Sequence, residues 1–243
     1  MKLRLAAALL VLSASTALAA DLTYEPAPVA APIEVFNWTG FYVGVHGGYG
    51  WGHTQDVSNP DAYGRTITGG FGGAQIGYNY QFANNVVLGA EADIAYSGIG
   101  QDWGGATEFD AYYGEDSIDW FGTVRARVGY SADRFLPYLI GGLAWANVDN
   151  KLGCDRARAP ASLGCGAQFE TSKSDTAWGW TAGAGVEYAV TNNVTVKAEY
   201  LYTDLGKNTV TLNDPNIPVI DSRNNREFDT SFNSIKVGLN YKF

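Results

Sequence analysis

Polar and apolar residues alternate strictly over the last stretch of the chain. Ile235, Val237, Leu239, Tyr241 and Phe243 fall on one face, and Ser234, Lys236, Gly238, Asn240 and Lys242 fall on the other. A period of two residues predicts a β-strand with one apolar and one polar face. In a soluble sheet the apolar face would cover a protein core, whereas in a membrane barrel it would contact lipid.

Seven stretches upstream show the same alternation and predict seven further strands. They cover residues 39–51, 66–81, 86–98, 118–130, 136–148, 176–190 and 194–203. The gaps 53–65, 100–117, 149–175 and 204–227 are long, and the gaps between them are short. This alternation predicts an all-β fold, an eight-stranded antiparallel up-and-down barrel with four long loops at one end and three short turns at the other. Strands of roughly 10–14 residues also fit a tilted membrane crossing.

Aromatic side chains gather near both ends of the apolar faces. Near the turns lie Tyr78, Tyr80, Tyr130, Tyr188, Tyr241 and Phe243, and near the loops lie Trp51, Trp120, Trp178 and Trp180. Two aromatic girdles around an aliphatic band are typical of the two membrane interfaces. A soluble lipocalin-like barrel is the alternative, but its lumen would be crowded with Trp and Tyr. The pattern therefore favours a transmembrane barrel with extracellular loops and periplasmic turns.

The polar faces place a set of charged residues inside the barrel. The acids are Glu91, Asp93, Asp119, Glu187 and Glu199, and the bases are Arg125, Arg127, Lys197, Lys236 and Lys242. Side chains just fill the interior of an eight-stranded barrel, so buried charges there must pair. We expect Arg125 and Arg127 to face Glu91 and Asp93, and Glu187 to lie across from Lys197. Such a network would plug the lumen or leave at most a narrow conduit.

The amino-terminus and the charge indicate the compartment. Residues 1–19 are expected to form a signal peptide, with Lys2 and Arg4 before an apolar run and a small-residue cleavage site after Ala19 or Ala20. Residues 20–36 form a Pro-rich periplasmic lead-in, and residues 37–243 form the barrel. The net charge of −9, with no basic stretch, argues against a nucleic-acid partner.

Two cysteines are present, Cys154 and Cys165, and both lie in the third long gap. An exported chain meets an oxidising compartment, so their proximity in one loop predicts a disulfide. A metal pair is the weaker alternative, because no His is near them in the sequence.

Residues suited to catalysis are sparse. The chain has two histidines: His46 is expected in the lumen among glycines, and His53 opens the first long gap. Neither lies in a recognisable nucleophile–base motif. The glycine clusters lack the ending of a P-loop, and the acidic second gap lacks EF-hand spacing. We expect no enzyme activity, no metal site and no cofactor.

Three stretches resemble a known family. They are FNWTGFYVGVHGGYGWG at 36–52, GGFGGAQIGYNYQF at 69–82 and VGLNYKF at 237–243. They are similar to small alphaproteobacterial outer-membrane β-barrels, OmpA-like or porin-family proteins that include surface antigens and haemin-binding proteins. The resemblance implies an outer-membrane barrel with a structural, surface-exposed role of the antigen or adhesion type. It carries no catalytic residues.

The family resemblance also implies partners. Outer-membrane lipid, lipopolysaccharide and the barrel-assembly machinery are expected, with peptidoglycan or a host surface as further options, around a monomer. Tyr241 and Phe243 resemble the signal that the assembly machinery reads. Haemin rests on the family alone, with Tyr112, Tyr113 and His53 as candidates. A small-solute porin and a haemin-binding receptor remain the alternatives.

Overall fold

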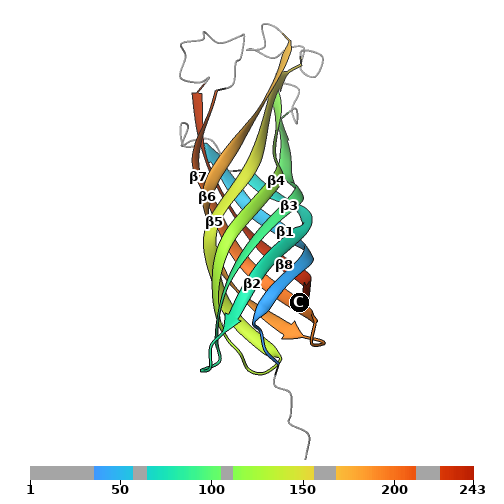
Figure 1. The fold of residues 1–243 in the computed structure, drawn as a ribbon. Coiled ribbons are helices and arrows are strands. Elements are labelled where there is room, and N and C mark those ends of the chain that lie inside the picture. Colours follow the sequence, from blue (N-terminus) through green and yellow to red (C-terminus); the bar gives the residue numbers. More distant parts are fainter. Residues whose placement is uncertain (1–35, 57–64, 105–111, 156–167, 212–224) are drawn as a thin grey trace, which may run out of the picture. The chain divides into compact units, whose positions relative to one another are not determined.

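The computed structural model describes residues 36–56, 65–104, 112–155, 168–211 and 225–243. Eight antiparallel strands, each bonded to the next, close into one barrel (Figure 1). They are β1 (Gly40–Asp56), β2 (Arg65–Gln81), β3 (Val86–Gly104), β4 (Tyr112–Tyr130), β5 (Phe135–Cys154), β6 (Phe169–Ala189), β7 (Val194–Thr211) and β8 (Asn225–Lys242). The predicted eight-stranded antiparallel barrel is confirmed. The predicted signal peptide, residues 20–35 of the lead-in, and Cys165 lie outside the described residues.

The alternation of residues explains which face of each strand is buried. Apolar residues of the outer faces are exposed, among them Phe41, Leu139, Leu143, Trp178 and Val237. Residues of the opposite parity are buried inside the barrel. The strands begin near their predicted ends at the turns but extend further at the loops, where the alternation fades while backbone pairing continues. The pairing of β5 with β6, for example, reaches Cys154 opposite Phe169. The described residues contain no helix long and apolar enough to cross a membrane.

A β-bulge on β4 changes which residues point into the barrel on the loop side of the bulge. The register with β5 shifts between Ile118 and Trp120, so one residue is left over there. Below the bulge Phe121 is inside the barrel, whereas above it Asp116 and Ile118 are buried. The prediction that Asp119 faces the lumen assumed an uninterrupted alternation. The bulge interrupts the alternation at Asp119, so the alternation no longer indicates which way this side chain points.

The turn end of the barrel is covered by residues 36–38, which we name the latch. The side chain of Trp38 is buried, and its indole Nε1 donates a hydrogen bond to the carbonyl oxygen of Asp133 at 3.0 Å. The backbone N–H of Trp38 donates to Oε1 of Gln81 at 2.9 Å. The rings of Phe36 and Trp38 meet edge to face at 4.8 Å. Phe36, assigned to the lead-in by sequence, therefore packs against the barrel.

The latch binds to a sharp turn. Asp133, between β4 and β5, has a φ of 55°, a left-handed conformation that Asp tolerates better than most residues. This conformation leaves its carbonyl oxygen to accept from Trp38, while its side-chain Oδ1 accepts from the N–H of Phe36 at 3.2 Å. The turn and the latch therefore hold each other in place.

Candidate functional site

Six buried ionic side chains form a single group in the lumen, which we name the central cluster. Its members are Glu91, Asp93, Arg125, Lys197, Glu199 and Lys236. Three carboxylates meet three cations, so the cluster is neutral. Its side chains come from β3, β4, β7 and β8, strands that surround the interior.

Arg125 joins the three acids of the central cluster. Its Nη2 lies 2.5 Å from Glu91 Oε1 and 2.6 Å from Asp93 Oδ2. Its Nη1 lies 3.3 Å from Glu199 Oε2. Glu91 is opposite Arg125 in the register of β3 and β4, so the closest contact follows directly from strand pairing. The guanidinium fork suits this role because it presents several donors in fixed directions.

The two lysines complete the central cluster from the other side. Lys197 Nζ lies 2.6 Å from Glu91 Oε2 and 3.1 Å from Glu199 Oε1. Lys236 Nζ lies 3.0 Å from both Asp93 Oδ2 and Glu199 Oε2. Hydroxyls satisfy remaining carboxylate lone pairs; these bonds are Tyr42 to Glu91, Tyr138 to Glu199 and Thr123 to Asp93, at 2.8, 2.7 and 2.9 Å. Burial of charge is tolerated because each charge is both paired and hydrogen-bonded.

Arg127 and Glu187 form a second ion pair, which we name the lower pair. Arg127 Nη1 lies 2.8 Å from Glu187 Oε2. Its Nε donates to Oδ1 of Asn79 at 2.7 Å, and its guanidinium carbon lies 5.0 and 5.1 Å from the ring centres of Tyr42 and Tyr138. Two tyrosine faces and one carboxylate therefore hold this guanidinium.

The lower pair differs from what the sequence suggested. Glu187 is opposite Lys197 in the register, as expected, but the ammonium of Lys197 bonds to the central cluster instead. Arg127 likewise bonds to Glu187 and not to Glu91 or Asp93. Long side chains in a narrow lumen reach across the interior as readily as along the wall, so adjacency in the sheet does not fix the partner.

Two of the predicted lumen charges lie apart from these groups. Asp119, at the bulge, accepts a hydrogen bond from the hydroxyl of Ser117 at 3.4 Å. Lys242 lies at the turn end, with its Nζ 5.1 Å from the ring centre of Phe36.

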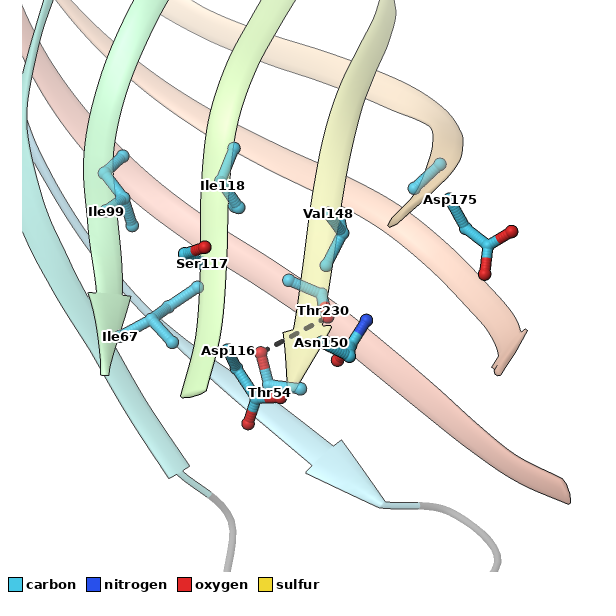
Figure 2. A pocket seen from close by; sticks show the side chains of 11 residues that line it. Thr54, Ile67, Ile99, Asp116, Ser117, Ile118, Val148, Asn150, Asp175 and Thr230 are labelled. Carbon is cyan, nitrogen blue, oxygen red and sulfur yellow. Dashed lines mark hydrogen bonds between the residues drawn. The ribbon is translucent and has the colours of Figure 1, made fainter. Parts of the chain in front are cut away.

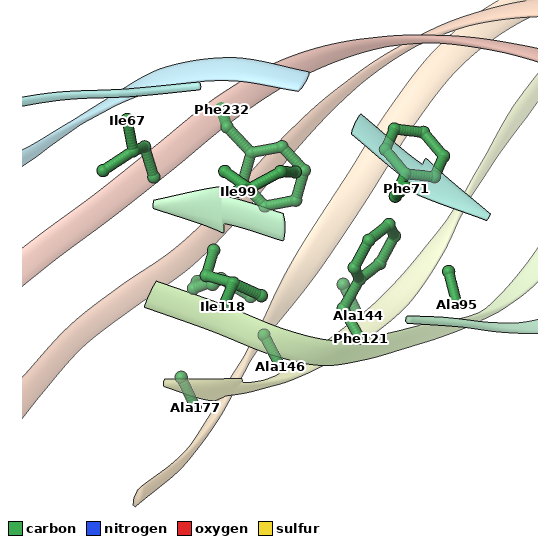
Figure 3. Packing of buried hydrophobic residues seen from close by; sticks show 11 residues of the cluster. Ile67, Phe71, Ala95, Ile99, Ile118, Phe121, Ala144, Ala146, Ala177 and Phe232 are labelled. Carbon is green, nitrogen blue, oxygen red and sulfur yellow. The ribbon is translucent and has the colours of Figure 1, made fainter. Parts of the chain in front are cut away.

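An apolar layer also lies inside the barrel, on the loop side of the central cluster. It was not predicted from the sequence. Phe71, Phe121 and Phe232 pack edge to face, with ring centres 5.1 and 6.0 Å apart (Figure 3). Ile67, Ile99, Ile118 and Leu205 belong to the same buried cluster. The sequence does contain a signal for this layer, because Phe71, Phe121 and Phe232 share the parity of the polar residues that face inward. We name these three rings the phenylalanine layer.

Above the phenylalanine layer is a small cavity at the loop end of the lumen (Figure 2). Its volume is about 20 Å³, room for about one water molecule. Ile67, Ile99, Ile118 and Val148 supply apolar lining, and Thr54, Asp116, Asn150, Asp175 and Thr230 supply polar groups. The hydroxyls of Thr54 and Thr230 are 3.3 Å apart. This space is too small for an organic ligand.

The two histidines lie in different surroundings. His46 is buried beneath the phenylalanine layer, with its ring centre 6.2 Å from that of Phe71. Neither of its ring nitrogens has a hydrogen-bond partner among the described residues. His53 is exposed on β1. No group of His, Cys, Asp and Glu in the described ranges is arranged to hold a metal ion.

The remaining predicted site residues lie near the two ends of the barrel. Cys154 ends β5 and is buried. Cys165 lies outside the described residues, so the disulfide between the two stays a prediction. The hydroxyl of Tyr113 donates to Glu170 at 2.8 Å. Tyr241 and Phe243 are exposed at the turn end, with ring centres 5.2 Å apart.

Known proteins match nearly the whole chain. A family model described as an outer membrane protein beta-barrel domain matches residues 5–243. The chain is 41% identical over 259 residues to the 31 kDa outer-membrane immunogenic protein of Brucella melitensis, covering 100% of both. It is 35% identical over 215 residues to the 22 kDa outer membrane protein of Rhizobium leguminosarum, covering 88% of this chain and 82% of that one.

Solved structures of outer-membrane proteins also match. The outer membrane protein OprG from Pseudomonas aeruginosa has a TM-score of 0.44 and 14% identity, over 85% of this chain and 97% of that one. Together with the curated relatives, the family match places the protein in the outer membrane. The chain belongs to the outer-membrane β-barrel family that includes these immunogenic proteins of alphaproteobacteria.

Proposed function

We propose that this protein is a structural barrel that displays its long loops on the cell surface and keeps its lumen closed. The observation that carries the closed lumen is the central cluster, in which three acids and three bases neutralise one another with almost no exposed area. A water-filled porin channel would instead leave such side chains solvated. The phenylalanine layer adds a second, apolar barrier towards the loops.

The energetic argument for closure rests on desolvation. Removing one partner of a buried ion pair typically costs about 3–5 kcal/mol, because the other charge stays buried. The cluster is therefore stable while it is complete, and an opening of the lumen has to separate several pairs at once. No catalytic step and no resident cofactor are part of the proposal.

The surface role is supported by the relatives, whose names describe outer-membrane immunogenic proteins. Labelling of intact cells tests the orientation that this role requires. A Lys151→Cys variant, at the loop end of β5, should react with a membrane-impermeant maleimide. An Arg134→Cys variant, at the turn end, should react only after the cells are opened. Reversed labelling would contradict the display of the loops, and the unmodified protein gives the background of the native cysteines.

Conductance in planar bilayers tests the closed lumen. The unmodified protein should give no large, steady steps in the current across the bilayer. A double variant, Arg125→Ala with Arg127→Ala, should unfold at lower temperature and conduct more, because water enters to solvate the abandoned carboxylates. Lys151→Ala is the matched control, since it breaks an exposed ion pair with Glu115 at 2.7 Å and leaves the lumen intact. Large steady steps from the unmodified protein would favour a small-solute porin instead.

A further inference from the structure

Strand β6 is longer than its pairing with β7. It pairs with β5 along its whole length, from Tyr188 opposite Phe135 to Phe169 opposite Cys154. Its pairing with β7 ends at Trp180 opposite Asp204. Beyond Trp180, the loop-side part of β6 has a strand partner on one edge only among the described residues. Figure 1 shows the β5–β6 hairpin and the β7–β8 hairpin diverging at this end of the barrel.

A bulge on β7 causes the divergence. The register of β7 with β8 shifts between Asp204 and Lys207, and Gly206 within the bulge has a φ of 64°. Asp204 Oδ1 accepts a hydrogen bond from the N–H of Gly206 at 2.8 Å, which fixes this conformation. After the bulge β7 continues to pair with β8 as far as Thr211 opposite Asn225. The upper part of β7 therefore follows β8 and leaves β6, as bulges commonly redirect a strand.

The hydrogen bonds next to the turn between β6 and β7 show which backbone groups of β6 face the open edge. The N–H of Ala189 donates to the carbonyl of Arg134 on the β5 side, and the N–H of Val190 donates to the carbonyl of Val194 on the β7 side. In an antiparallel strand, successive residues direct their backbone groups to opposite sides. The register with β5 runs without a shift. Ser172, Ser174 and Thr176 therefore direct their N–H and carbonyl groups towards the open edge.

We propose that this open edge of β6 binds an extended, basic polypeptide segment by strand addition. An edge with unpaired backbone donors and acceptors is a template for another strand, and the backbone bonds supply the affinity. The edge lies beyond Trp178 and Trp180 of the outer aromatic girdle, on the side of the long loops, so a segment outside the cell can reach it.

The charge beside the edge selects a basic partner. Glu170 is exposed on β6, and Asp204 lies on β7 opposite Trp180. Lys173, the one described cation of this part of β6, is paired with Asp175 at 3.4 Å. Lys207, across the border, is 3.5 Å from Glu227. Among the described residues of this edge the cations are thus paired and the excess charge, from Glu170 and Asp204, is negative, which attracts Lys and Arg and repels a second copy of this acidic chain.

A synthetic probe separates strand addition from simple charge attraction. The probe is a fluorescent peptide of alternating Lys and Val residues, and its binding to the full-length protein in detergent micelles is followed by anisotropy. A second peptide of the same sequence carries N-methyl groups on alternate residues, so its charge is kept while its backbone donors on one side are lost. We expect the methylated peptide to bind at least roughly tenfold more weakly, because several backbone bonds are lost.

Variants of β6 give the matching test on the protein. Ser172→Pro with Ser174→Pro removes two N–H groups that face the open edge and spares the backbone bonds to β5, so the barrel should fold. It also removes the bond from the Ser174 hydroxyl to Asn147 of β5, a loss that the alanine control below shares. Ser172→Ala with Ser174→Ala keeps both N–H groups and is the control. We expect the proline variant to lose roughly tenfold or more in affinity and the alanine variant to bind normally.

The inference is overturned if the unmethylated peptide does not bind at all. It is also overturned if the methylated and unmethylated peptides bind equally, because charge alone would then explain the affinity. A heat-shift gel verifies that the variants are folded. If the proline variant does not fold, the comparison of the two peptides on the unmodified protein still decides.

Discussion

Glu187 and Lys197 lie directly opposite each other on β6 and β7, yet their charged groups bond to different partners. The carboxylate of Glu187 bonds to Arg127 at 2.8 Å, and the ammonium of Lys197 bonds to Glu91 at 2.6 Å. In the described part of the chain no ion pair joins the lower pair to the central cluster, although Tyr42 and Tyr138 contact both groups. Mutations in the two groups should have separable effects on stability.

A double-mutant cycle tests this separation. Arg127→Met and Glu187→Gln should show a coupling of about 1–3 kcal/mol, because they remove the two halves of one contact. Lys197→Met and Glu187→Gln should couple more weakly than this, because the two side chains are neighbours but share no ion pair. Urea unfolding in lipid vesicles, followed by tryptophan fluorescence, gives the four free energies of each cycle. A larger coupling in the second cycle would mean that the cross-strand neighbours pair in the membrane.

Phe121→Ala tests whether the phenylalanine layer stabilises the barrel. Phe121 contacts both other rings of the layer, so its truncation should cost about 3–5 kcal/mol through lost burial and a cavity. Conductance should stay low, because the central cluster below is complete. Unfolding and bilayer recordings on the same preparation measure both quantities.

Phe41→Ala is the control for this prediction. Phe41 is 64% exposed on the outer face and contacts lipid in the membrane, so its truncation opens no cavity in the lumen. It should destabilise the barrel less than Phe121→Ala. A high conductance of Phe121→Ala would contradict the assignment of closure to the charges and transfer it to the rings.

Gly72 and Gly73 are neighbours in β2 with opposite tolerance to a side chain. A Cβ at Gly73 would collide with the carbonyl oxygen of Ile94 and lie 2.7 Å from Cα of Ala95, inside the barrel. A Cβ at Gly72 would meet only the carbonyl oxygen of His46, at 3.6 Å. We expect Gly73→Ala to cost about 1–3 kcal/mol and Gly72→Ala to stay within about 0.5 kcal/mol of the unmodified protein. Equal effects in urea unfolding would show that the wall relaxes around the added methyl group.

The latch makes a prediction at the other end of the barrel. Trp38→Ala should cost about 3–5 kcal/mol, because the indole is almost fully buried. It should also expose the chain near Phe36 to a protease added at the turn end. Trp38→Phe keeps the ring body and loses the bond to Asp133, which is worth about 0.5–1.5 kcal/mol. If Trp38→Ala leaves both the stability and the cleavage unchanged, the latch is not a stable part of the fold.

The barrel could be predicted from the sequence because one face of each strand is uniform. Lipid selects apolar residues at every second position, and the same period marks the strand and its facing, as in β8. The register of β6 with β7 followed from a short turn, and Glu187 opposite Lys197 confirms it. These features are local, so reading along the chain recovers them.

The interior could be predicted only in part, since its contacts join distant strands. Lys197 and Glu91 are 106 residues apart in the chain, and their contact depends on barrel closure. The position of Asp119 depends on a bulge that no residue of β4 announces. The phenylalanine layer could have been predicted from the sequence, because Phe71, Phe121 and Phe232 occupy inward positions of β2, β4 and β8.

The contact between β1 and β8 has a consequence for how the chain is ordered. Their register runs from Tyr42 opposite Lys242 to Asp56 opposite Phe228, as continuous as that of strands joined by a turn. The hydrogen-bonded wall of the folded barrel is therefore as continuous between the first and last strands as between any other two neighbours. A circular permutant with its ends moved to the turn at 82–85 would keep the same cylinder and place Phe243 in mid-chain. Comparing its insertion with that of the natural order would separate what the cylinder requires from what the order of synthesis contributes.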